Sequence, residues 1–92
     1  MTPTLAEDLA LRALAWLAAD QELCGVFMGA TGATAGDLRQ RAAEPEFLAS
    51  VLDFLTMDDA WVVAFCDAHG VPYDAPMRAR AVLPGGEAHH WT

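Results

Sequence analysis

Apolar residues recur every three to four positions along most of this chain, which is the spacing of one face of an α-helix. Residues 45–55 give the cleanest pattern, because one arc of that helix is entirely apolar: Phe47, Leu48, Val51, Leu52, Phe54 and Leu55. No segment shows the strict alternation of a half-buried strand. The pattern therefore predicts an all-α fold, a compact single-domain bundle of five to six short helices.

Capping residues predict where the first three helices begin. Thr4 and Glu7 have the spacing of a capping box, in which each side chain bonds the other residue's backbone amide. Asp20 is a candidate N-cap for a second helix that would end at a glycine in the run 29–36. Thr34 is expected to cap a third helix, with Asp37 completing a weaker capping box.

The second half of the chain is expected to hold three more helices. Pro45 fits the first turn of one, and an aspartate at 58 or 59 starts the next, which ends at Gly70. Asp74 is the predicted cap of the last helix, with Met77 and Ala81 facing inward. Segment 60–69 is apolar nearly all round, so we expect it at the centre of the bundle. The predicted core is Trp16, Phe47, Val51, Phe54, Leu55, Trp61 and Phe65.

Length permits one domain, which we expect to span residues 1–84, with residues 85–92 forming a flexible tail. The first helix carries Leu11 and Leu14 among its polar positions. Either this helix lies between others, or these two leucines form a surface for a partner. The hydrophobic fraction of 54% exceeds the usual ~45–50%, which leaves apolar surface for a dimer or a partner unless alanine accounts for the excess.

Charge restricts the choice of partner. The chain has five arginines, no lysine and thirteen acids, for a formal net charge of -8. Such a surface repels nucleic acid and anionic lipid unless its cations are gathered into one patch. Three arginines instead follow an aspartate at i,i+4 spacing, which predicts ion pairs on helices: Asp8 with Arg12, Asp37 with Arg41, and Asp74 with Arg78.

No constellation of residues predicts catalysis, a cofactor or a metal. The glycine-rich run 29–36 lacks the lysine of a phosphate-binding loop and follows a predicted helix. His89 and His90 are adjacent on the tail, whereas a zinc site needs three or four convergent ligands. Cys24 and Cys66 lie in apolar runs without metal-ligand spacing, so we expect buried, reduced thiols. We therefore expect no catalytic, cofactor-binding or metal-binding residues.

The segment from Glu44 to Leu55, together with Thr31-Gly32, Asp37-Leu38-Arg39 and the later Ala64-Phe65, Gly70 and Pro72, resembles a small family of alphaproteobacterial proteins. That family is named only as a domain of unknown function (3572). The resemblance covers about residues 4–84, and its most specific part is the Pro-x-Phe-Leu sequence leading into Val-Leu-Asp-Phe-Leu. It implies a compact helical fold in a bacterial cytoplasm, and it implies no activity and no functional residues.

These observations together predict a small acidic, cytoplasmic helical protein that acts as a non-enzymatic protein–protein interaction or regulatory module. Leu11 and Leu14 are the candidate interaction surface, and the partner is expected to be a basic protein or a second copy of the chain. The absence of a basic leader and the short apolar stretch 9–19 argue against a membrane. The alternative is a DNA-associated regulator resembling a helix-turn-helix, with Arg39 and Arg41 on its recognition helix.

Overall fold

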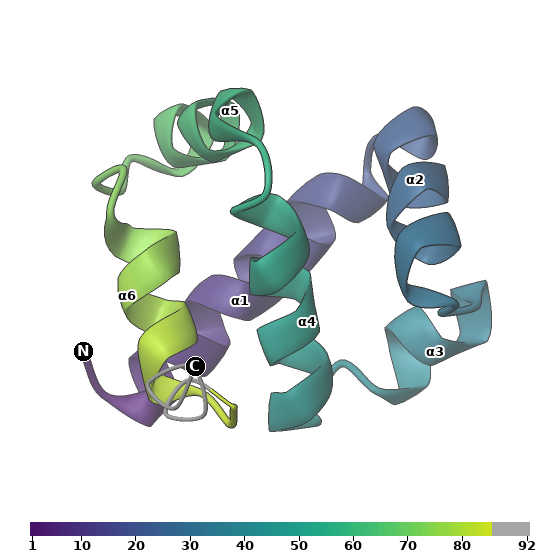
Figure 1. Ribbon diagram of the computed structural model, residues 1–92, viewed down its shortest axis with the longest axis horizontal. Helices are drawn as coiled ribbons and strands as arrows, with labels where there is room; N and C mark the ends of the chain where they lie inside the picture. The colour runs from purple at the N-terminus through teal and green to yellow at the C-terminus, as the bar shows by residue number, and fades with distance from the viewer. Residues whose placement is uncertain (86–92) are drawn as a thin grey trace.

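Six helices make up most of the part of the chain that the computed structural model describes, residues 1–85 (Figure 1). They are α1 (Pro3–Ala18), α2 (Gln21–Thr31), α3 (Ala35–Gln40), α4 (Pro45–Leu55), α5 (Asp59–His69) and α6 (Ala75–Val82). The predicted all-α class and the number of helices are confirmed. The predicted flexible tail, apart from Gly85, lies outside the described residues, as do His89 and His90. None of the six helices combines the length and the apolar character that a membrane span requires.

The longest helix, α1, is the one against which α2, α4 and α6 pack. It passes diagonally behind α4 in Figure 1, with α6 beside its N-terminal half and α2 following its C-terminal end. Ala6, Ala10 and Ala13 of α1 are completely buried. Their small side chains allow neighbouring helices to approach the α1 backbone closely, and this makes α1 the centre of the bundle.

The prediction that segment 60–69 forms the centre is wrong. The corresponding helix, α5, lies at one end of the bundle and buries only Phe65 and Cys66 (Figure 1). The other large apolar residues of α5 are only partly covered, because Trp61 and Val62 are half-buried and Val63 remains 41% exposed. Periodicity cannot distinguish an apolar side chain that faces solvent from one that faces another helix.

Phenylalanine rings connect the helices in the core. Phe27 of α2 is fully buried, and the centroid of its ring lies 6.1 Å from Phe47 and 5.2 Å from Phe54, both on α4. Phe54 also stacks on Trp61 of α5. The predicted core positions Phe47, Val51, Phe54, Leu55 and Phe65 are buried, whereas Trp16 and Trp61 are half-buried and pack against that core.

Most of the predicted helix ends are confirmed. The Asp20, Thr34 and Asp58 side chains cap α2, α3 and α5, and the Thr34–Asp37 capping box is complete. Gly32 and Gly70 end α2 and α5 in the left-handed conformation, with φ of 76° and 65°.

Thr4 was the wrong cap for the first helix. Thr2 is the N-cap of α1, and its Oγ1 accepts a hydrogen bond of 3.2 Å from the backbone N–H of Leu5. Pro3 then occupies the first helical position, where the absence of an N–H group costs nothing and the fixed φ suits a helix. One consequence is that Thr4 lies within the helix.

The inward face of the last helix was also predicted wrongly. Met77 is 68% exposed and Ala81 is exposed, whereas α6 buries Ala75, Pro76 and Ala79. Because α6 packs on α1 and α4 through these small residues, its backbone comes close to both helices. A methionine at this interface would hold the helices apart.

Two of the three ion pairs predicted from i,i+4 spacing form, and the third arginine pairs with a different carboxylate. Arg12–Asp8 and Arg78–Asp74 form as predicted, at 3.7 and 3.9 Å. Arg41 instead pairs with Glu44 at 3.2 Å, because the Asp37 carboxylate accepts the Thr34 backbone N–H within the capping box.

Arg80 connects the end of α6 to α4. Its Nε donates to the Asp53 carboxylate, and its Nη1 donates to the Pro84 carbonyl at 3.0 Å. The Arg80 side chain is only 15% exposed. This residue therefore holds the C-terminal end of α6 in place through two charge-assisted hydrogen bonds.

Two adjacent residues of α2 test the aromatic core. We expect Phe27→Ala to lower the free energy of unfolding by about 3–5 kcal/mol, because it removes a buried ring and leaves a cavity. Val26→Ala should change it by less than about 0.5 kcal/mol, because Val26 is 48% exposed. Urea denaturation followed by circular dichroism measures both; equal losses would contradict the packing described here.

The role of Arg80 is tested against its neighbour on the same helix. We expect Arg80→Gln to cost about 1–2 kcal/mol of stability, since it removes the hydrogen bonds to Asp53 and Pro84. Arg78→Gln removes the same charge from an exposed pair and should cost less than about 0.5 kcal/mol. Thermal unfolding of the two variants provides the comparison, and a loss at Arg78 as large as that at Arg80 would refute the clamp.

Candidate protein-binding groove

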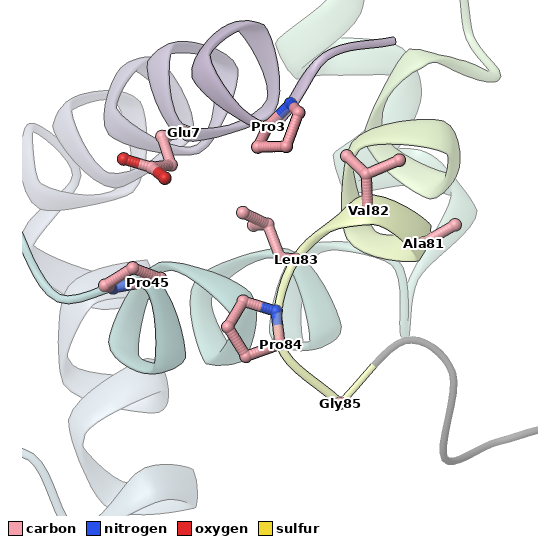
Figure 2. Close-up of a pocket in the computed structure, with 8 residues that line it drawn as sticks. All are labelled: Pro3, Glu7, Pro45, Ala81, Val82, Leu83, Pro84 and Gly85. Carbon is pink, nitrogen blue, oxygen red and sulfur yellow. The ribbon is translucent and has the colours of Figure 1, made fainter.

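A small cleft of about 260 Å³ is lined by Cys66, Asp67, Gly70, Val71, Pro72 and Tyr73. A larger cleft lies where the N-terminal ends of α1 and α4 meet the C-terminal end of α6 (Figure 2). It has a volume of about 610 Å³ and is lined by Pro3, Glu7, Pro45, Ala81, Val82, Leu83, Pro84 and Gly85. Among the described residues that line it, Glu7 is the only one with an ionisable side chain.

A third cleft is a groove between the C-terminal part of α1, the first turns of α2 and the first half of α5. We call it the tryptophan groove. It has a volume of about 370 Å³ and is lined by Trp16, Asp20, Glu22, Leu23, Val26, Trp61 and Ala64. Two of these residues are large aromatic side chains from different helices, and two are carboxylates at the start of α2.

Both indole rings are fixed by phenylalanines of the core. The Trp61 ring stacks on Phe54 with centroids 4.7 Å apart and an interplanar angle of 25°. Trp16 meets Phe65 edge-on, with centroids 5.9 Å apart. Each tryptophan is nevertheless half-buried, so part of each ring faces the groove. The groove therefore presents aromatic surface in a fixed orientation.

Aspartates that cap α2 and α5, the two outer helices of the groove, contribute negative charge near it. Asp20 accepts hydrogen bonds of 3.0 and 3.1 Å from the backbone amides of Glu22 and Leu23. Asp58 caps α5 in the same way, through the Ala60 amide at 2.8 Å. Helix capping explains these aspartates, and their charges also act on the groove between the helices. Neither α2 nor α5 contains an arginine.

The structure does not place Leu11 and Leu14 together on one exposed surface. Leu14 is buried, with 6% exposure, and Leu11 is 41% exposed. Because α1 is covered by α2, α4 and α6, Leu14 packs into the core although it falls among polar positions. Scattered exposed leucines, such as Leu11 and the 58% exposed Leu5, are ordinary on a protein surface.

Sequence reasoning missed the tryptophan groove because it assigned Trp16 and Trp61 to the core. The available signal was the presence of an acidic residue near each tryptophan, at positions 20 and 58. Each acid lies within one helical turn of the ring in sequence. This spacing is compatible with a tryptophan that reaches the edge of the core.

The two cysteines are free, and they differ in environment. Burial raises the pKa of the Cys66 thiol, and the charges of Asp67 and Asp74 raise it further. Its Sγ donates to the Pro72 carbonyl at 3.4 Å. A protonated, buried thiol is a poor nucleophile. Cys24 is half-buried, so the prediction that both thiols are buried holds fully only for Cys66.

Tyr73 and His69 lie near Cys66 in sequence and are both accounted for by local contacts. The Tyr73 hydroxyl donates to Asp67 at 2.7 Å, and this hydrogen bond raises the pKa of the tyrosine. The His69 ring packs on Phe65 with centroids 4.6 Å apart. Within residues 1–85, no three His, Cys, Asp or Glu side chains converge as metal ligands would.

The glycine-rich run ends α2 and starts α3. The Thr34 backbone N–H donates to Asp37, and the Asp37 N–H donates to the Thr34 hydroxyl. These amides are therefore already satisfied within the capping box. On the same short helix segment, Arg41 pairs with Glu44 and lies over the Phe47 ring at 4.9 Å, so it does not project freely as a DNA-reading side chain would.

Comparison with known proteins places the chain in a family. Neither the curated proteins nor the solved structures contain a match. Residues 3–86 match the family described as "Protein of unknown function (DUF3572)", which agrees with the resemblance seen in the sequence. The match spans nearly the whole chain, and the protein therefore belongs to this family of unknown function.

Proposed function

We propose that this protein is a non-enzymatic interaction module that binds another protein in the tryptophan groove. The observation that carries the proposal is the pair of half-buried indoles, Trp16 and Trp61, each held by a core phenylalanine. Tryptophan is enriched among the residues that dominate binding energy at protein interfaces. Rings that are already fixed lose little conformational freedom on binding, so more of their contact energy becomes affinity.

The remaining lining of the groove supports the same function. Val26 is 48% exposed beside the two rings, and Leu23 forms the floor with 8% exposure. Apolar surface in a groove, with carboxylates at one edge, matches the arrangement of an interface core with a polar rim. Binding would remove this apolar surface from water, which is the main source of favourable free energy in association.

The chemistry-bearing residues favour binding over catalysis. The buried Cys66 thiol has a raised pKa, and Glu7 is the one titratable group among the described residues that line the larger cleft. Arg12, Arg41, Arg78 and Arg80 are each paired with a carboxylate, which weakens the case for a DNA-associated regulator. A cytoplasmic location forms part of this proposal.

Three glutamine variants test the proposed surface. Val26→Gln fills the groove with a polar side chain, whereas Val63→Gln makes the same change at a comparably exposed site of α5 that does not line the groove. Leu11→Gln tests the surface first predicted from the sequence. Each tagged variant and the unchanged protein are used to capture partners from a native lysate, and the captured proteins are compared quantitatively.

We expect a stoichiometric partner that is retained by Val63→Gln and Leu11→Gln and reduced about tenfold by Val26→Gln. That reduction corresponds to about 1.4 kcal/mol, within the range for one interface contact. Circular dichroism and thermal unfolding confirm that all three variants fold. If Val26→Gln captured as much partner as the unchanged protein, or if Leu11→Gln reduced the capture instead, the groove would not be the binding surface.

A further inference from the structure

We infer that the occupant of the tryptophan groove is a positively charged amphipathic helix of a partner protein. This inference rests on the proposed function and specifies the chemistry of the partner. Three features of the groove lead to it: the sign of its charge, the chemical nature of its walls, and the poor fit of a second copy of the same chain.

The charge around the groove is negative on both sides. Asp20 and Glu22 line it directly, and Asp58 and Asp59 stand at the start of α5, one turn before Trp61. None of the five arginines lies on α2 or α5. The basic residue of α5 is His69, in its last turn. Arg12 of α1, one turn before Trp16, pairs with Asp8 at 3.7 Å. No arginine on either outer helix neutralises the carboxylates, and a cationic partner therefore gains from them.

The indoles favour a cation for a second reason. A lysine ammonium or an arginine guanidinium is attracted to the face of an aromatic ring, and tryptophan is the strongest acceptor of this kind. Phe54 covers one face of Trp61 by stacking, and the half-buried ring still lines the groove. A partner with both apolar and basic side chains can therefore place its apolar groups against the apolar lining and its cations against the indole rings and the carboxylates of the groove.

The walls of the groove belong to three helices, and an apolar groove of this kind can receive the apolar face of an amphipathic helix. A segment that binds by adding a strand needs a free sheet edge, and residues 1–85 contain no strand to supply one. A helix satisfies its own backbone hydrogen bonds and contributes side chains at i, i+3 and i+4 spacing. A volume of about 370 Å³ accommodates a few such side chains, not a folded domain.

A second copy of this chain fits the groove poorly. Each copy carries a formal net charge of -8. Four of its arginines already pair with carboxylates of the same chain, as described above. Bringing two such surfaces together at an acidic groove costs like-charge repulsion.

The first test uses a synthetic amphipathic peptide of about 18 residues, roughly five helical turns, with leucine on one face and lysine on the other. A matched peptide carries glutamate at every lysine position. Binding of each fluorescently labelled peptide to the full protein is measured by anisotropy at low and moderate salt. We expect the lysine peptide to bind at least about tenfold more tightly than the glutamate peptide, and the difference to shrink as salt screens the charges.

A pair of isosteric variants locates this effect. Glu22→Gln removes a carboxylate from the groove, and Glu46→Gln removes one from the same position in the first turn of α4, outside the groove. Both helices have 11 residues, and both variants change the net charge equally. We expect Glu22→Gln to weaken binding of the lysine peptide about two- to fivefold, and Glu46→Gln to leave it unchanged.

The outcomes separate this inference from the proposed function. Equal effects of Glu22→Gln and Glu46→Gln would mean that net charge attracts the peptide, and this would overturn the inference. Stronger binding of the glutamate peptide, abolished by Val26→Gln, would also overturn it while leaving the groove as a binding site. If Val26→Gln instead abolished only self-association, a second copy would be the occupant. If Val26→Gln altered neither peptide binding nor partner capture nor self-association, the proposed function itself would fail.

Discussion

The contacts of Phe54 connect the core of this protein to its surface. Its ring lies 5.2 Å from Phe27 and 4.7 Å from Trp61, so one side chain of α4 joins α2 to α5. α5 contributes only Phe65 and Cys66 as fully buried residues, and its position therefore depends strongly on these aromatic contacts. The tryptophan groove is lined by residues of α2 and α5, which both contact the Phe54 ring, and by Trp16 of α1.

The buried alanines of α1 allow a compact centre, and the two tryptophans lie outside it. Ala6, Ala10 and Ala13 let α4 and α6 pack closely on α1, and this compact centre is completed by leucine, valine and phenylalanine side chains. Trp16 and Trp61 pack against the outside of this core, where they are half-buried.

The sequence predicted the helices well because their signals are local. Asp20, Thr34 and Asp58 act on amides two or three residues away, and Gly70 needs only its own backbone conformation. The order of packing was harder to predict because it depends on residues distant in the sequence. Segment 60–69 was predicted to be central because it is apolar nearly all round, whereas close approach at the small residues of α1 makes that helix the centre.

The candidate binding site was harder to predict from the sequence than the helices or their packing. Leu14 departed from the amphipathic pattern because α1 is covered on several sides, and not because it faces a partner. A tryptophan in an apolar run predicts a core position, and only the packing shows that its ring also faces a groove. The acidic caps near Trp16 and Trp61 gave the one sequence signal, which has a structural explanation of its own.

The double role of the two tryptophans links binding to stability. A partner that binds the folded groove and not the unfolded chain adds RT ln(1 + [L]/Kd) to the free energy of unfolding, about 2.7 kcal/mol at one hundred times Kd. Domains of this size are stable by only about 5–15 kcal/mol. Occupation of the groove would therefore stabilise α5 in particular, because this helix is held mainly by the same rings that form the groove. By the same linkage, a change that loosens Phe54 or Phe65 weakens partner binding without touching the partner, since each fixes one of the indoles.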